Sequence, residues 1–171
     1  MTNDQKAVAI GASSGIAGMV LIVWGLSNLI PGPAIADTAG DRIAYALRWA
    51  VIAILPFLAM VIAVGNARFK SEAIDPTRGK ESAAMVVDGR VADNTLQQFL
   101  LFLLGSLGLA TVLPIERLSI VAAAAVTFVI VRTAFWIGYR IKPVYRAFGF
   151  SSTVYMNIGM LAATLWLWLA G

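Results

Sequence analysis

The chain has 171 residues, of which 60% are hydrophobic and 13% are charged, and its formal net charge is +4. Soluble domains carry about a quarter charged residues, so this composition excludes an ordinary soluble domain and indicates an integral membrane protein. The lysines and arginines form no basic stripe, which argues against a nucleic-acid partner. The sequence has no cysteine and no histidine, so disulfides and thiolate metal sites are excluded, and we expect no metal site.

Five apolar stretches are long enough to cross the hydrocarbon core of a bilayer, which needs about 20 helical residues. They cover residues 7–30, 43–67, 95–114, 117–139 and 152–170. Five spans in a chain of this length leave almost no room for a soluble domain. We therefore expect an all-α integral membrane protein with five transmembrane helices.

The distribution of cations predicts the orientation in the membrane. With five spans, the N-terminus, the 68–93 loop and the 140–151 loop share one side, whose cations are Lys6, Arg68, Lys70, Arg78, Lys80, Arg90, Arg140, Lys142 and Arg146. The opposite side carries Arg42, Arg48 and Arg117. By the positive-inside rule the first side is cytoplasmic. In a bacterial inner membrane this places the N-terminus in the cytoplasm and the C-terminus in the periplasm.

The first span carries glycines in a segment similar to the glycine-rich turn of dinucleotide-binding dehydrogenases. That turn needs a strand before it and an amphipathic helix after it, whereas the residues that follow here are uniformly apolar. Gly11, Gly15, Gly18 and Gly25 instead predict a close helix–helix contact. Two prolines at 31–33 then end this helix.

Turn signals and prolines organise the middle of the chain. Pro56 predicts a kink in the second span. Residues 71–89 alternate charges and turn dipeptides, and we expect a flexible loop that covers the cytoplasmic face. Gly105 and Gly108 predict a packing seam on the third span. The connection at 113–117 is short enough to require an antiparallel hairpin between the third and fourth spans.

The fifth span contains polar residues with two different expected roles. Ser151, Ser152 and Thr153 are good N-cap residues, and we expect the last helix to begin there. Asn157 lies inside this span, where a helix–helix hydrogen bond is the expected use of a side-chain amide.

Two polar clusters lie near the cytoplasmic ends of the third and fourth spans. Arg90, Asn94, Gln97 and Gln98 have the spacing of one helix face, at the mouth of the third span. The second cluster runs from 132 to 146. Its first member, Arg132, lies about two turns inside the fourth span. A charged side chain at this depth costs a few kcal/mol of free energy unless it is paired, so Arg132 should face the amides of the third span.

If the clusters meet, they form a cytoplasmic-facing pocket rich in arginine, amide and tyrosine side chains. Arginine binds carboxylates and amides pair with peptide groups, so the pocket suits an anionic, peptide-like ligand. A nearby cation also lowers the pKa of a thiol and would activate a nucleophile supplied by that ligand.

The two clusters resemble a known family. Arg90, three residues, Asn94, two residues and Gln97, followed by an apolar helix, is similar to a signature of the MAPEG family, the membrane-associated proteins in eicosanoid and glutathione metabolism. The stretch Arg132-Thr-Ala-Phe-Trp-Ile-Gly-Tyr139, six residues and Arg146 is similar to the end of the third helix and the catalytic arginine of its leukotriene-synthase branch.

The resemblance implies a four-helix bundle over about 43–170, with the first helix as an addition. It implies two parts, an extra N-terminal helix and turn at 1–36 and a MAPEG-like membrane domain at 37–171 that contains the cytoplasmic loop 68–93. It also implies a homotrimer in the lipid bilayer, glutathione as co-substrate and a lipophilic small molecule as the electrophile.

Residue by residue, the resemblance assigns Arg146 to stabilising the glutathione thiolate. It places the remaining polar residues around glutathione: Arg68, Arg90, Asn94, Gln97, Arg132 and Tyr139. This sequence departs from the family pattern at Gln97, where the family normally has glutamate.

These features leave more than one function open. The first is a glutathione-dependent transferase or peroxidase. The second is a noncatalytic scaffold or accessory subunit of a larger membrane complex, which keeps the fold but has lost glutathione binding through Gln97. A small transporter is less well supported, since the sequence shows no inverted repeat and no acidic residue in the middle of a span.

Overall fold

The computed structural model describes residues 1–170, and the regular secondary structure in this range is helical. The helices are α1 (Asn3–Leu29), α2 (Ala39–Ala53), α3 (Leu55–Phe69), α4 (Ala83–Val112), α5 (Ser119–Ile141) and α6 (Ala147–Ala170). Short 3-10 turns lie in the connections: η1 (Glu72–Ile74), η2 (Pro76–Arg78), η3 (Ile115–Arg117) and η4 (Pro143–Arg146). Since α2 and α3 make one span, five segments of residues 1–170 are long and apolar enough to cross a membrane, which confirms the predicted fold class.

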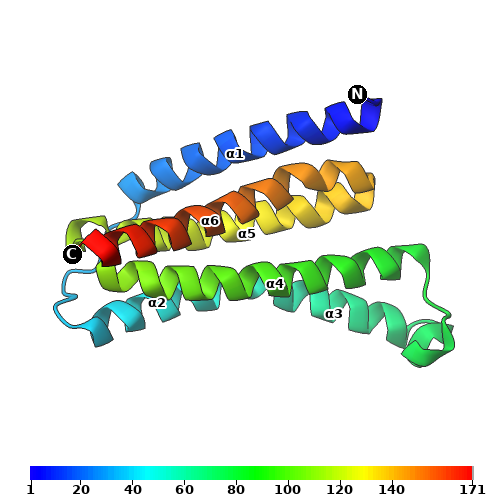
Figure 1. The fold of residues 1–171 in the computed structure, drawn as a ribbon. Helices are drawn as coiled ribbons and strands as arrows, with labels where there is room; N and C mark the ends of the chain where they lie inside the picture. The colour runs from blue at the N-terminus through cyan, green and yellow to red at the C-terminus, as the bar shows by residue number, and fades with distance from the viewer. Residues whose placement is uncertain (171) are drawn as a thin grey trace.

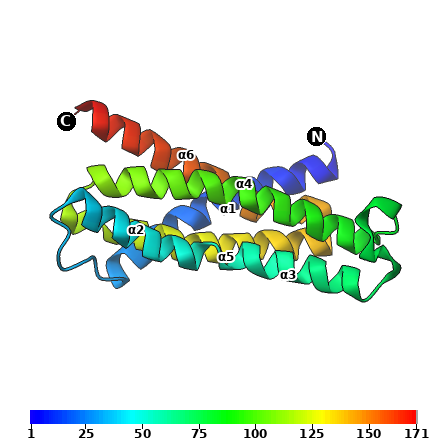
Figure 2. The same ribbon diagram turned by 90° about the horizontal axis from the view of Figure 1, so that it is seen from below.

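The helices run roughly along one long axis (Figure 1). The pair α2 and α3 packs on α4 and α5, and α6 packs on the same two helices. Helix α1 lies along α6 and α5 on the outside of the bundle (Figures 1 and 2). The N-terminus, the connection from α3 to α4 and the connection from α5 to α6 lie at one end of the molecule. This is the end to which the sequence assigned most of the cations.

The core between α4 and α5 is aromatic and apolar. The rings of Phe102 and Phe128 lie with centroids 4.9 Å apart, and Phe99 contacts both at 6.3 and 6.1 Å. Such ring pairs add to the stabilisation that comes from burial alone. The expected interruption near Pro56 is confirmed, because α2 ends at Ala53 and α3 begins only at Leu55.

Helix α4 begins at Ala83, well before the expected start of the third span. Ser82 is its N-cap: its hydroxyl accepts a hydrogen bond from the backbone N–H of Met85 at 3.3 Å. The expectation of a flexible loop over 71–89 is therefore wrong for its second half, which is helical, while η1 and η2 occupy much of its first half. Asp88 had the charge pattern of a loop residue, but it lies in the second turn of a helix.

Helix α6 also begins earlier than expected, at Ala147. Ser151, Ser152 and Thr153 are therefore not N-caps but buried residues inside the helix. Each hydroxyl donates to a backbone carbonyl one turn earlier, at 2.7 Å. Small side chains that satisfy their own polar groups in this way leave room for a close helix neighbour.

That neighbour is α1, whose glycines predicted a close contact with another helix. A side chain on Gly15 would clash with the backbone carbonyl of Phe148, and Gly11 and Gly18 also face residues 147–148 of α6. The prediction is wrong for Gly25, which has nothing within 4 Å of the position a Cβ would take.

The predicted seam on the third span is also confirmed. Gly105 and Gly108 of α4 pack against the side chains of Met160 and Thr164 of α6. The seam lies in the C-terminal halves of α4 and α6, whereas the N-terminal halves of the same two helices line a cavity.

Candidate functional site

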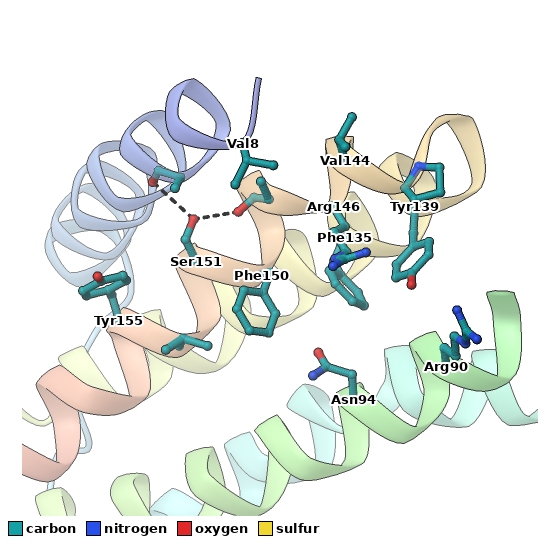
Figure 3. A pocket seen from close by; sticks show the side chains of 14 residues that line it. Val8, Arg90, Asn94, Phe135, Tyr139, Val144, Arg146, Phe150, Ser151 and Tyr155 are labelled. Carbon is teal, nitrogen blue, oxygen red and sulfur yellow. Dashed lines mark hydrogen bonds between the residues drawn. The ribbon is translucent and has the colours of Figure 1, made fainter. Parts of the chain in front are cut away.

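A cavity of about 580 Å³ lies between α4, α5, η4 and α6, at the end of the bundle that carries the N-terminus (Figure 3). Helix α1 closes one side of it. The lining residues are Val8, Ala12, Arg90, Asn94, Phe135, Tyr139, Pro143, Val144, Arg146, Ala147, Phe150, Ser151, Val154 and Tyr155.

The two polar clusters meet in this cavity. Arg90 and Asn94 come from α4, Tyr139 from α5 and Arg146 from the short turn η4 between α5 and α6. The guanidinium carbon of Arg146 lies 4.9 Å from the centroid of the Tyr139 ring, a cation–π contact that holds the arginine over the ring. The expectation that these groups share one hollow is confirmed, and their roles toward a ligand stay predictions.

The close approach of α5 and η4 depends on a glycine. A side chain on Gly138 would lie 2.7 Å from the carbonyl oxygen of Tyr145, so only glycine lets the chain fold back directly after α5. This reversal carries Arg146 back over the ring of Tyr139, which is the residue that follows Gly138.

The cavity is electropositive. Its charged lining residues are Arg90 and Arg146, and its lining, as the structure describes it, includes no carboxylate. Neither arginine forms an ion pair within residues 1–170. Both guanidinium groups can therefore offer their planar donors to an anion.

A third arginine near the site is already neutralised. Asp88 of α4, whose side chain is only 3% exposed, accepts hydrogen bonds from Arg140 at 2.8 and 2.5 Å and from the indole N–H of Trp136 at 2.8 Å. This Asp88 clasp, made of Asp88, Trp136 and Arg140, ties α4 to α5 beside the cavity. Sequence reasoning missed it, because Asp88 lies in a segment that was expected to be a loop.

Arg132 is fully buried behind the cavity and does not line it. Its guanidinium donates to the hydroxyl of Thr95 at 2.6 and 3.2 Å and to the amide oxygen of Asn94 at 3.0 Å. The guanidinium carbon also lies 4.0 Å from the Phe135 ring centroid. The expected pairing of this arginine with the third span is thus confirmed for Asn94. Because the Asn94 oxygen is engaged behind the wall, its NH₂ group is the part left to donate into the cavity.

Gln97 and Gln98 do not join the cavity. Gln98 is buried and accepts a hydrogen bond from the amide of Asn157 at 2.9 Å, and the same amide donates to the Gln98 carbonyl at 3.0 Å. The predicted helix–helix hydrogen bond of Asn157 is confirmed. Gln97 is exposed on the outer surface of α4. The expectation of one shared face for the four polar residues is therefore wrong, since consecutive residues on a helix point about 100° apart.

Arg68 lies at the end of α3, away from this cavity. Its guanidinium pairs with Glu81, in the connection before α4, at 2.5 Å. It therefore has a structural partner within the chain, and its assignment to a ligand stays a prediction.

The comparisons with known proteins agree with the fold and the motifs. The model of the MAPEG family matches residues 46–166. Transmembrane protein 79 of Mus musculus is 24% identical over 129 residues, which cover 75% of this chain and 33% of that protein. Transmembrane protein 79 of Bos taurus is 25% identical over 160 residues, which cover 92% of this chain and 40% of that protein.

The chain thus spans between about a third and two fifths of the length of these curated relatives. No solved structure matches the chain. The family match covers well over half of the chain and includes α3, α4, α5, η4 and most of α6. This chain belongs to the MAPEG family.

Proposed function

We propose that the protein is a glutathione-dependent transferase or peroxidase that acts on a lipophilic electrophile. The observation that carries this proposal is the convergence of Arg90, Asn94, Tyr139 and Arg146 on one cavity that holds two cations without ion-pair partners in residues 1–170. Membership of a family named for glutathione metabolism supports the same conclusion.

The chemistry follows from the groups that line the cavity. Glutathione carries two carboxylates and two peptide groups, so Arg90 would bind a carboxylate and the NH₂ of Asn94 would donate to a carbonyl or carboxylate oxygen. Arg146, placed over Tyr139, would stabilise the thiolate after the thiol loses its proton to solvent. The sulfur would then form a bond to the electrophilic carbon, whose bond to the leaving atom breaks as that atom takes the electron pair.

The proposed assembly is a homotrimer in the inner membrane of a bacterium, with the N-terminus in the cytoplasm. Asp93 and Gln97, one turn apart, are exposed on the outer surface of α4. Polar groups on the outside of a span are costly in lipid, so a second copy packed on this surface would stabilise them. The excess of cations at the N-terminal end of the bundle supports the orientation.

A noncatalytic role in a larger membrane complex is the second candidate, and two observations favour it. Gln97 replaces the family's glutamate and lies outside the cavity, and the cavity's described lining offers no carboxylate to bind the ammonium group of glutathione. Losing such a partner from a desolvated site costs about 2–5 kcal/mol of binding free energy.

Isothermal titration of the detergent-solubilised protein with glutathione separates the two candidates. We expect saturable binding in the millimolar range or tighter, weakened about tenfold, or about 1.4 kcal/mol, by either Arg90→Gln or Arg146→Gln. Arg117→Gln is the matched control, because this arginine is exposed in η3 at the opposite end of the bundle. Absence of heat at millimolar glutathione, with the oligomer intact, would contradict the enzyme proposal and favour the noncatalytic one.

A further inference from the structure

The cavity has two chemically different ends. Arg90 and Tyr139 lie at one end, whereas Val8 and Tyr155 lie at the other, with Phe150 between them (Figure 3). Ala12, one turn after Val8 on α1, and Val154, next to Tyr155 on α6, also line the cavity. Ser151 lies at this end as well, but its hydroxyl is already bonded to backbone carbonyls, so the lining offers mainly hydrocarbon and ring carbon. We call this second end, formed by Val8, Ala12, Phe150, Val154 and Tyr155, the apolar end.

Two of the five residues of the apolar end, Val8 and Ala12, come from α1. This helix lies outside the residues that match the family model, which begin at 46, so Val8 and Ala12 add a surface to the cavity that the matched region lacks. Val8 keeps 42% of its surface exposed and Tyr155 keeps 50%, which is surface that a ligand can cover.

Helix α1 is held firmly enough to act as a wall. The hydroxyl of Ser152 lies 2.8 Å from the carbonyl oxygen of Gly15, and that of Ser151 lies 3.2 Å from the carbonyl oxygen of Ala12. Each hydroxyl shares its one proton between α1 and a carbonyl of its own helix. At the N-terminal end of α1, Asp4 pairs with Lys142 at 2.9 Å. Ala12 is one of the residues docked in this way, and Val8 lies one turn before it on the same side of α1. Both side chains are therefore fixed relative to α6.

A cavity that is cationic at one end and apolar at the other selects an amphipathic anion. An anionic head gains charge-assisted hydrogen bonds at the guanidinium groups, and an apolar tail gains by leaving water. The reverse placement would leave both arginines without partners and bury a charge among apolar side chains.

We propose that α1 and α6 form a subsite for the hydrocarbon chain of an amphipathic ligand whose anionic head lies between Arg90 and Arg146. The identity of the head as a glutathione moiety rests on the proposed function, whereas the position of the tail does not. For the proposed enzyme this means that the hydrocarbon chain of the electrophile lies against α1 when the sulfur–carbon bond forms.

The test compares S-methylglutathione with S-hexylglutathione by titration calorimetry on the full-length protein in detergent micelles. We expect the hexyl compound to bind about tenfold more tightly, since each methylene withdrawn from water adds to affinity. Val8→Trp and Ala12→Trp fill the apolar end and should each bring the ratio of the two dissociation constants close to one. Ile10→Trp is the matched control, because Ile10 lies on the same helix, is 70% exposed and does not line the cavity, so the ratio should keep its wild-type value. Partition into micelles is the same for every variant and cancels in the comparison.

A parallel titration uses hexyl phosphate, which puts the same chain on a plain anionic head. If neither glutathione compound binds but hexyl phosphate binds and is lost in Val8→Trp, the proposed function fails and the subsite stands. If S-methylglutathione binds and the hexyl preference is equal in all four proteins, the subsite is refuted and the proposed function stands. If no compound binds, both are refuted.

A second measurement uses the wild-type protein, so its result does not depend on substitutions that could displace α1. S-hexylglutathione with a diazirine at the end of its chain is photolysed in the wild-type protein, and the adducts are located by mass spectrometry. Adducts on residues 8–12 that excess S-hexylglutathione displaces are the expected result. Displaceable adducts confined to α2, α3 or α4 would overturn the proposal.

Discussion

The Asp88 clasp gives a prediction that depends on no ligand. Asp88→Ala removes the acceptor for three hydrogen bonds and leaves the indole N–H of the half-buried Trp136 without its partner. Because Asp88 joins α4 to two residues of α5, the change should destabilise the contact between these helices rather than one helix alone.

The magnitude follows from exposure. A hydrogen bond to a charged group contributes about 1.5–3 kcal/mol, which we apply to the bond from the half-buried Trp136 to the buried carboxylate of Asp88. The Arg140 side chain is 52% exposed, so its share falls to that of a surface pair, about 0–1 kcal/mol. Together these give a loss of about 1.5–4 kcal/mol in the free energy of unfolding. Asp88→Asn keeps one acceptor oxygen and should lose less.

The assay is equilibrium unfolding in mixed micelles with a rising mole fraction of dodecyl sulfate, followed by far-ultraviolet circular dichroism. Glu72→Gln is the control, since Glu72 pairs with Lys80 on the surface with its side chain 81% exposed, and no resolvable change is expected. A loss for Asp88→Ala no larger than that of Glu72→Gln would refute the reasoning.

Three further perturbations test how α1 and α6 are attached to the rest of the bundle. Gly15→Leu should release α1 from α6 and open the N-terminal segment to protease, whereas Gly25→Leu, at an open position, should not. Asn157→Ala removes two interhelical hydrogen bonds and should lower the free energy of unfolding by about 0.6–1.7 kcal/mol in the same micelle assay; an unchanged midpoint would argue against those bonds. The hydrogen bond to Asp4 raises the pKa of Lys142, so this attachment should hold at neutral pH and weaken as the pH rises through that raised pKa; cross-linking of the two residues would follow it, and a loss already at neutral pH would contradict the assignment.

The parts of the fold that were predictable depend on local pattern. The lengths of the apolar stretches predicted the five spans, and the short hairpin between the third and fourth spans predicted that α4 and α5 are neighbours. Helical spacing placed Arg90 and Asn94 on one face of α4, although it wrongly added Gln97 and Gln98 to that face. Their meeting with Tyr139 and Arg146 was stated from the sequence as a condition, which the structure meets.

The parts that were missed depend on partners far away in the sequence. Asp88 has the charge of a loop residue, and only Arg140, 52 residues later, makes it favourable inside a helix. Ser151 reads as a helix cap, but its hydroxyl bonds to its own helix and to α1, from which it is separated by 139 residues. The glycines of α1 indicated a close contact without indicating the partner, so the contribution of α1 to the cavity could not be predicted.

The central claim is that this cavity holds a thiolate beside Arg146, and ultraviolet difference absorbance of bound glutathione tests it most directly. At saturating glutathione and neutral pH, the wild-type protein should show thiolate absorbance, because a guanidinium at the sulfur lowers the thiol pKa. Arg146→Gln, saturated with glutathione, should lose that signal while Arg117→Gln keeps it. Equal absorbance in wild type and Arg146→Gln, or no thiolate in the saturated wild-type protein, would contradict the account.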